Sequence, residues 1–159
     1  MIYKYMTAKK LMKFMSWWPP YLFTGVSVKE VSDDFLKIKV QMKQKIYNTN
    51  YVGTHFGGSL YSMCDPWFMF ILMEHLGKDY IVWDKNASID FKTPGKGTVW
   101  AEFELTKADI ITAKKMANEN HKYEPEYTVK VLDQNHEVVA VVHKTLYVRR
   151  KGNFKNEIF

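Results

Sequence analysis

The chain has 159 residues and a mass of 18.8 kDa, which suits a single domain. Hydrophobic residues make up 47% of it, charged residues 25% and aromatic residues 16%, and this composition excludes a disordered or fibrous chain. The net charge is +6, but 21 of the 23 basic residues are lysines spread along the whole chain. Because base readout and phosphate forks favour arginine, we expect no nucleic-acid partner. A basic surface suits an anionic small molecule instead.

Cysteine content and apolar runs indicate the compartment. The single cysteine, Cys64, cannot form an internal disulfide, so nothing here requires an oxidising environment. Lysines are scattered through residues 1–15, and no apolar stretch there is long enough for a signal peptide. The most apolar run, residues 59–76, is interrupted by Asp65 and Pro66, whereas a membrane span needs about 20 apolar residues. We therefore expect a cytoplasmic protein without a membrane span.

The first half of the chain predicts one strand between two helices. Apolar residues recur at helical spacing from Ala8 to Met15, and Pro19 and Pro20 are expected to end that helix. Residues 36–42 alternate between apolar and polar side chains, which is typical of a half-buried strand. Residues 48–58 form a loop punctuated by glycines. Residues 59–76 are apolar on nearly every side, which predicts a buried helix that ends at Gly77.

The second half of the chain reads mostly as strands. We expect strands over residues 80–91, 99–105, 127–131 and 138–148, and a short helix over residues 109–118 capped by Asp109. One buried helix and about five strands favour an α+β fold, in which an antiparallel sheet wraps around one long central helix. We expect residues 1–159 to form one domain, with the N-terminal helix and the Trp/Pro segment of residues 1–20 packed on it.

Two features of the central region point to chemistry. Gly57 and Gly58 stand just before the first turn of the buried helix, where the backbone can approach a ligand closely. Free amides and the positive end of the helix dipole point there, as a developing oxyanion requires. Asp65 lies two turns further along the apolar helix. Because an isolated carboxylate is costly to bury, it should face a cavity, a partner or water.

These residues resemble the hotdog-fold thioesterases, particularly the phenylacetyl-CoA thioesterase type. That type carries an Asn-x-x-Gly-x-x-His-Gly-Gly motif, with an acidic residue nine positions after the histidine. Asn50, Gly53, Gly57 and Gly58 fall in register, and Asp65 takes the acidic position. Phe56 stands in place of the histidine, and His55 is displaced by one position. The resemblance covers nearly the whole chain, including residues 17–21 and 82–85.

The resemblance implies a hotdog fold and hydrolysis of an acyl thioester such as an acyl-CoA. Asp65 would be the general base or the nucleophile, the helix-end amides would bind the oxyanion, and Asn50 would position the carbonyl. His55 is the weakest catalytic candidate, and the loss of the motif histidine allows for weak, altered or absent activity. The candidate catalytic residues are thus Asp65, Asn50, Gly58, Gly57 and His55, and the candidate substrate or CoA contacts are Phe56, Ser59, Lys92 and Lys96.

The same resemblance implies an active site between two subunits. We therefore expect a homodimer or a dimer of dimers with residues 48–65 at the interface, since an exposed strand edge is rarely tolerated. No resident cofactor is expected, because CoA enters only as part of the substrate. No cluster of His, Cys and Asp has the spacing of metal ligands, so we expect no metal.

Each candidate residue also has a purely structural explanation. The paired glycines would equally allow the helix to start tightly against the sheet, Asn50 would suit a turn, and Asp65 would bind backbone freed by Pro66. His55-Phe56 also resembles the His-Phe pair of the hotdog dehydratases. That class is disfavoured because its catalytic acid should lie further along the helix, where this sequence has apolar residues such as Met69. The main rival is a non-catalytic protein that binds acyl-CoA or fatty acyl groups, since the same pocket would serve it.

Overall fold

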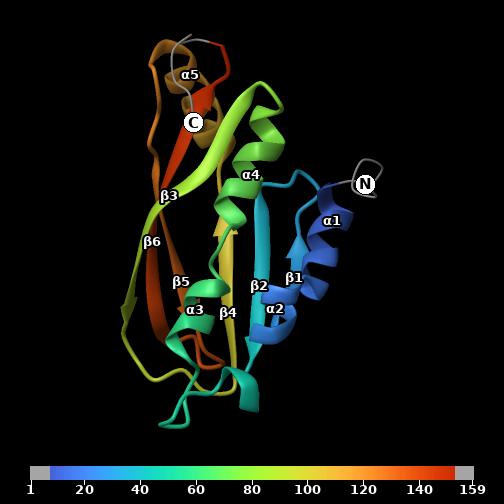
Figure 1. The fold of residues 1–159 in the computed structure, drawn as a ribbon, viewed down its shortest axis with the longest axis vertical. Coiled ribbons are helices and arrows are strands. Elements are labelled where there is room, and N and C mark those ends of the chain that lie inside the picture. The colour runs from blue at the N-terminus through green and yellow to red at the C-terminus, as the bar shows by residue number, and fades with distance from the viewer. Residues whose placement is uncertain (1–7, 153–159) are drawn as a thin grey trace.

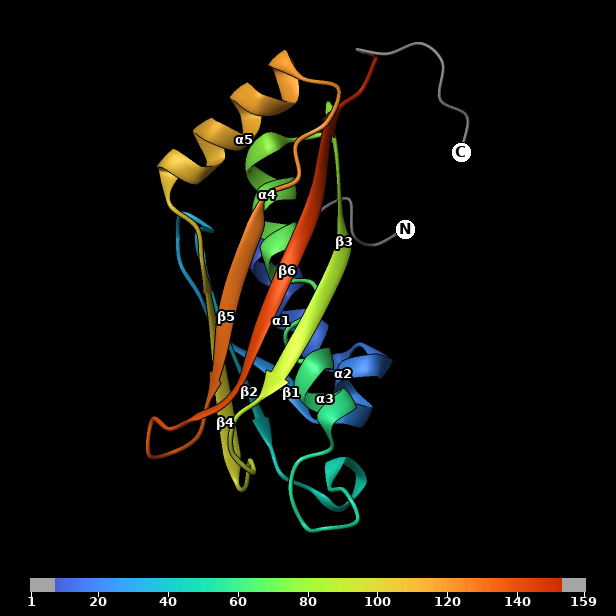
Figure 2. The ribbon, with the colours of Figure 1, turned by 90° about the vertical axis from the view of Figure 1, so that its left-hand side faces the viewer.

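Six strands form one antiparallel sheet in the order β1-β2-β4-β5-β6-β3. The computed structural model describes residues 8–152, so the first seven residues of the predicted N-terminal segment lie outside the described residues. Helices cover one face of the sheet, as Figures 1 and 2 show, and β1 and β3 form its two edges within the described residues. The strands are β1 (Val26–Val31), β2 (Lys37–Lys43), β3 (Tyr80–Phe91), β4 (Thr98–Glu104), β5 (Glu126–Leu132) and β6 (Val138–Arg150).

The predicted central helix is divided into two segments. Helix α3 spans Gly57–Ser62 and α4 spans Trp67–Leu76, with the break over residues 63–66. Proline cannot donate the backbone hydrogen bond that a continuous helix needs, so Pro66 stands at the break and α4 begins after it. Asp65 therefore lies in the break rather than inside a helix. Helix α4 ends at Gly77 as predicted, with a φ of 78° that glycine adopts readily.

The strands predicted from period-two patterns are confirmed to within two residues, and one strand was missed. β1 is a short edge strand whose pairing with β2 shifts register between Val28 and Glu30. A strand of only six residues with such an irregularity leaves too little alternation in the sequence to predict it. Its edge position is supported by α1 and α2, which lie beside it (Figure 1).

Helix boundaries differ from the prediction at two places. Helix α1 spans Ala8–Phe14 and continues into the 3₁₀ turn Met15–Trp17, but the two prolines then open a second helix, α2 (Pro19–Thr24). Proline is well suited to a first helical turn because its missing N–H has no partner there anyway. Helix α5 (Lys107–Glu119) is capped by Thr106, and Asp109 completes the capping box three residues later rather than capping the helix itself.

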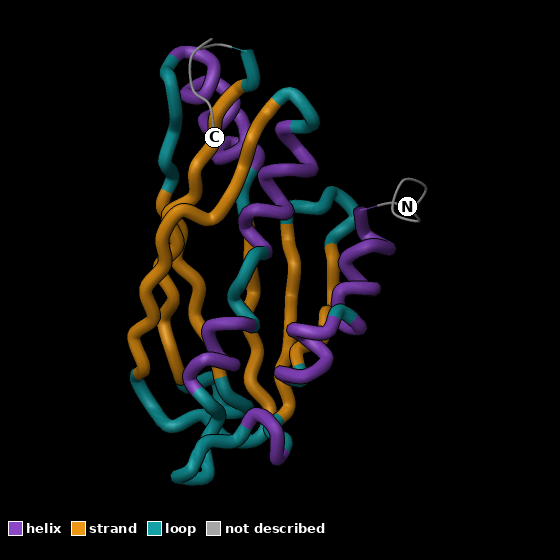
Figure 3. The backbone as a smooth tube through the Cα atoms, viewed as in Figure 1, coloured by secondary structure: helices purple, strands orange, loops and turns teal. Residues whose placement is uncertain are grey.

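The core lies between the sheet and the divided central helix. Trp67, Phe68, Ile71 and Leu72 of α4 are buried against the inward side chains of the strands. Met12 of α1 and Tyr21 of α2 are also buried, so the described part of the N-terminal segment packs on the domain. A further 3₁₀ turn (Ile46–Asn48) and the loops that follow β2 and β3 gather at the end of the molecule away from α5 (Figure 3).

Candidate active site

The loop before α3 is held together by Asn50. Its Oδ1 accepts hydrogen bonds from the backbone N–H groups of Val52 and Thr54, at 3.1 and 3.0 Å. Its Nδ2 donates to Thr54 Oγ1 at 2.9 Å and to the carbonyl of His55 at 3.3 Å. Both polar atoms of the side chain thus have partners within the loop itself. This geometry favours the turn explanation, in which Asn50 shapes the loop rather than touching the substrate.

His55 joins this loop to the segment after β3. Its backbone N–H donates to the carbonyl of Gly95 at 2.9 Å, and its ring Nε2 lies 3.0 Å from the carbonyl of Gly97. A carbonyl only accepts, so Nε2 carries the proton and Nδ1 is an acceptor. Nδ1 is buried with no hydrogen-bond partner among the described residues. Burial lowers the pKa of His55, and the imidazole is therefore neutral at neutral pH.

Two phenylalanine rings explain why glycines occupy the start of α3. A Cβ atom on Gly57 would lie 2.8 Å from the Phe91 ring, and one on Gly58 would lie 2.5 Å from the Phe56 ring. Both rings are more than half exposed. Ser59, one residue further along, is buried. The amides of the two glycines are the first of the helix and have no acceptor within it, so the structure accommodates both explanations of the glycine pair.

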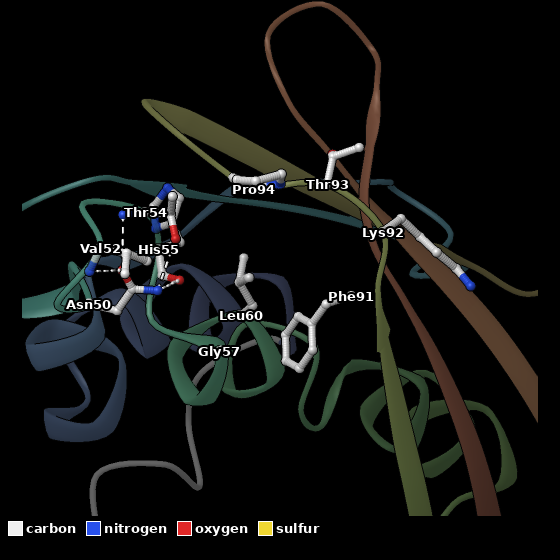
Figure 4. A pocket seen from close by; sticks show the side chains of 11 residues that line it. Asn50, Val52, Thr54, His55, Gly57, Leu60, Phe91, Lys92, Thr93 and Pro94 are labelled. Carbon is white, nitrogen blue, oxygen red and sulfur yellow. Dashed lines mark hydrogen bonds between the residues drawn. The ribbon is translucent and has the colours of Figure 1, made fainter.

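A pocket of about 430 Å³ lies between this loop and the segment that follows β3 (Figure 4). Lys92 stands at it with a half-exposed side chain, 3.6 Å from a carboxylate oxygen of Asp90. Lys96 is exposed but does not line the pocket, and neither does Asp65. The lining residues are Asn50, Val52, Thr54, His55, Gly57, Leu60, Phe91, Lys92, Thr93, Pro94 and Gly95.

Asp65 is held by a buried lysine. Its Oδ1 accepts a hydrogen bond from Lys144 Nζ at 2.7 Å, while its backbone carbonyl accepts from the Tyr21 hydroxyl. The Asp65 side chain is 44% exposed, but that of Lys144 is only 1% exposed. Lys144 Nζ also lies 3.1 Å from Asp84 Oδ2 and 5.4 Å from the centre of the Tyr61 ring. Beside the break in the central helix, the carboxyl groups of Asp65 and Asp84 thus both lie against the ammonium group of Lys144.

Burial and the charges of the neighbouring side chains shift the pKa values of Asp84 and Lys144. Burial and the neighbouring Asp65 carboxyl raise the pKa of Asp84 to about 6, against the opposing effect of Lys144. Burial lowers the pKa of Lys144, but the hydrogen bond to Asp65 and the charge of Asp84 outweigh it, so that pKa is raised overall. Asp84 Oδ1 is buried without a hydrogen-bond partner in the part of the chain that the structure describes. The single positive charge of Lys144 is therefore shared between the Asp65 and Asp84 carboxyl groups.

Sequence reasoning missed Asp84 and Lys144, although a signal was present. Alternate residues of β6 face the core, and Lys144 stands between Val142 and Leu146 in that buried row. A lysine at an inward position of an apolar strand needs a partner, because a buried charge is costly unless it is paired. Asp84 is partly buried on the neighbouring strand β3, opposite Leu146 of β6. The helix break then places Asp65 against both.

Other kinds of site find little support within residues 8–152. That stretch contains no group of three or more His, Cys, Asp or Glu side chains that could hold a metal ion. Cys64 is buried, and burial raises the pKa of its thiol to about 12, so it is not a thiolate nucleophile. None of the helices described in the structure is both long and apolar enough to cross a membrane.

Comparisons with known proteins place the chain by family and by fold. Residues 7–148 match the family described as a domain of unknown function (DUF4442). No curated protein matches the chain. Similar solved structures include a Pseudomonas aeruginosa protein of unknown function described as a probable thioesterase, with a TM-score of 0.76 at 19% identity, covering 90% of this chain and 93% of that one.

Two further structures extend this comparison. A thioesterase from Haemophilus influenzae has a TM-score of 0.67 at 13% identity, covering 96% of this chain and 97% of that one. The PaaI protein of the E. coli phenylacetic acid degradation operon has a TM-score of 0.54 at 17% identity, covering 95% and 88%. The predicted α+β hotdog fold is confirmed, as is the resemblance to hotdog-fold thioesterases at the level of fold.

Proposed function

We propose that this chain, which belongs to the DUF4442 family, hydrolyses small acyl thioesters such as acyl-CoA. The observation that carries the proposal is the Asp65 carboxylate, which stands half-exposed in a break of an otherwise apolar central helix. Packing alone does not call for a carboxylate there, and a buried lysine holds it in one orientation. The fold shared with structures described as thioesterases supports the same activity.

In the proposed reaction, Asp65 acts as the general base. It takes a proton from water as the water oxygen bonds to the thioester carbonyl carbon, and the carbon–sulfur bond then breaks. The proton passes to the leaving thiolate, so the products are a carboxylic acid and a free thiol. The free amides of Gly57 and Gly58 would stabilise the oxyanion that forms on the carbonyl. Direct attack by the Asp65 carboxylate on the carbonyl is the second way in which the same residue could act.

The proposed active form is a homodimer, singly or as a dimer of dimers, because the pocket and Asp65 do not come together within the described residues of one chain. The pocket beside Gly57 does not include Asp65. β3 is a strand of 12 residues at the edge of the sheet, and such an edge is a template for pairing. Pairing of two β3 strands would form one continuous sheet and bring the 48–65 regions of both chains together. The pocket of one chain would then meet Asp65 of the other.

The chemistry of the pocket supports an acyl group attached to an anionic carrier. Leu60, Phe91 and Val52 present apolar surface to it, and the exposed ring of Phe56 lies next to Gly58. Lys92 at the pocket would meet a phosphate of CoA, and Lys96 lies further along the same segment. Ser59 is buried in α3 and does not line the pocket. CoA enters as part of the substrate, and no resident cofactor takes part.

A non-catalytic acyl-CoA binder is the second candidate, and one observation favours it. Phe56 occupies the place of the motif histidine, and the neighbouring His55 ring is engaged with the Gly97 carbonyl. No imidazole is therefore free to assist hydrolysis at this position. Binding without turnover is the outcome that this alternative requires.

The test is thiol release from a panel of short, long and aromatic acyl-CoAs by wild type, Asp65→Asn and Asp79→Asn. General bases contribute about 10²–10⁴-fold to rate, so Asp65→Asn should lower kcat by about 10²-fold or more. Asp79 is exposed, does not line the pocket and is not an ion-pair partner of Lys144, so Asp79→Asn should leave kcat unchanged. Circular dichroism reports folding. Wild type that binds acyl-CoA but releases no thiol would support the binder and overturn the hydrolase.

A further inference from the structure

Asp84 and Lys144 form, with Asp65, a carboxylate–lysine cluster that the proposed reaction does not yet use. The three side chains come from β3, β6 and the α3–α4 break, and β3 and β6 are neighbouring strands of the sheet (Figure 1). Lys144 Nζ lies within hydrogen-bond distance of a carboxylate oxygen of each aspartate, at 2.7 and 3.1 Å. Burying the Lys144 ammonium group and most of the Asp84 carboxyl group is costly, so a cluster like this calls for a reason beyond packing.

The charges of the cluster do not balance when both carboxyl groups are ionised. Two carboxylates that share one site cannot both ionise freely, and the more buried one retains a proton more readily. The Asp84 side chain is 17% exposed and that of Asp65 is 44% exposed, so a proton that the pair takes up goes to Asp84. Asp84 Oδ1 is buried and has no hydrogen-bond partner among the described residues, so it is unoccupied and able to take up that proton.

We infer that Asp65, Asp84 and Lys144 act as one proton-sharing unit, in which Lys144 positions Asp65 and Asp84 holds the proton that Asp65 removes from water. This inference rests on the proposed hydrolysis. Lys144 binds Oδ1 of Asp65 and leaves Oδ2 for the water molecule. The proton moves from water to Asp65 and on to Asp84, and returns through Asp65 to the thiolate when the carbon–sulfur bond breaks. Asp84 and Lys144 are positioning residues, since they act through Asp65.

The groups that surround the cluster do not titrate in the range where it works. Tyr21 of α2 and Cys64 beside the break face it, and burial raises the pKa of both their side chains well above neutral pH. Tyr61 of α3 presents its ring to Lys144. Asp84 is therefore the group of the cluster that we expect to change charge near pH 6.

The first test is the pH profile of kcat in Asp84→Asn and Lys144→Met. Removal of the Asp84 charge should move the acid limb to lower pH by about one unit or more, and removal of the Lys144 charge should move it to higher pH by a similar amount. Asp84→Asn should also lower kcat by about tenfold, since proton transfer loses its second acceptor. Asp79→Asn is the control and should leave the limb in place. Acid limbs that stay fixed in both cluster variants would overturn the inference.

The second test does not depend on hydrolysis. In protein labelled with ¹³C at aspartate carboxyl carbons, one resonance of the wild type should titrate near pH 6 and be absent from Asp84→Asn. If no carboxyl titrates there, the proton-sharing unit is wrong even when thiol release is normal. If the resonance titrates near pH 6 but no thioester is cleaved, the proposed function fails and the shared proton stands. Should Lys144→Met not fold, Asp84→Asn and this titration decide the inference.

Discussion

His55 shows how a single buried side chain can make the stability of the loop depend on pH. Its pKa is lowered from the ordinary value of 6.5 by burial, so the folded protein binds a proton less readily than the unfolded chain. As pH falls through 6.5, the unfolded chain therefore takes up a proton that the folded protein does not, and stability is lost. We expect His55→Gln to reduce the fall in Tm between pH 7 and pH 5, measured by circular dichroism.

The control for this prediction is His136→Asn. His136 is exposed at a turn with a φ of 62°, a conformation that asparagine tolerates, so this variant should keep the slope of wild type. The raised pKa of Asp84 contributes an opposite slope, because protonation between about pH 4 and 6 favours the folded state. That contribution is the same in both variants and cancels in the comparison. A His55→Gln slope equal to that of wild type would contradict the burial argument.

At the scale of elements, Trp67 anchors the break that carries Asp65. Its side chain is fully buried, its Nε1–H donates to the carbonyl of Met63 at 2.7 Å, and its ring stacks on Tyr21 with centroids 5.3 Å apart. Trp67→Phe would leave that carbonyl without its donor, at a cost of about 1–3 kcal/mol, and would also leave unfilled volume. We expect a lower urea midpoint with an unchanged m-value.

Trp17→Phe is the matched substitution for this measurement. The Trp17 side chain is 71% exposed, so the same chemical change there should alter the free energy of unfolding by less than about 0.5 kcal/mol. Similar losses in the two variants would mean that the indole hydrogen bond does not hold the break. A loss confined to Trp67→Phe would connect the packing under α4 to the position of Asp65.

The elements divide into those that local patterns predict and those that they do not. β2, β4 and β5 follow from alternation of apolar and polar residues, which is a property of neighbouring positions. The division at Pro66 has a local cause, but the apolar run continues on both sides of it and hides the break. The contact between Asp65 and Lys144 joins residues 79 positions apart, and it depends on the register of β3 with β6 and on the path of the chain through the break. No local pattern contains that information.

At the scale of the whole molecule, the free edge of β3 decides whether a complete site can form. Lys92 N–H donates to the carbonyl of Val139, so that residue points toward β6. Successive residues of a strand point their backbone groups alternately to either side, and counting back by two places Asp90 and Ser88 toward β6 as well. The N–H groups of Ile89 and Ala87 then face the free edge, where a second copy would pair.

Ala87→Pro should therefore separate the subunits without unfolding them. Proline removes an N–H that none of the described strands of the same chain uses, and edge strands tolerate it. In light scattering at micromolar concentration, wild type and Ala87→Ser should have about twice the 18.8 kDa mass of the chain, or about four times that mass as a dimer of dimers, and Ala87→Pro should lose the β3 pairing and have a lower mass, that of one chain where wild type is a dimer. Thiol release should be lost with the dimer, because the pocket and Asp65 would no longer meet. A monomeric wild type, or an Ala87→Pro variant that remains dimeric and active, would show that β3 is not the pairing edge.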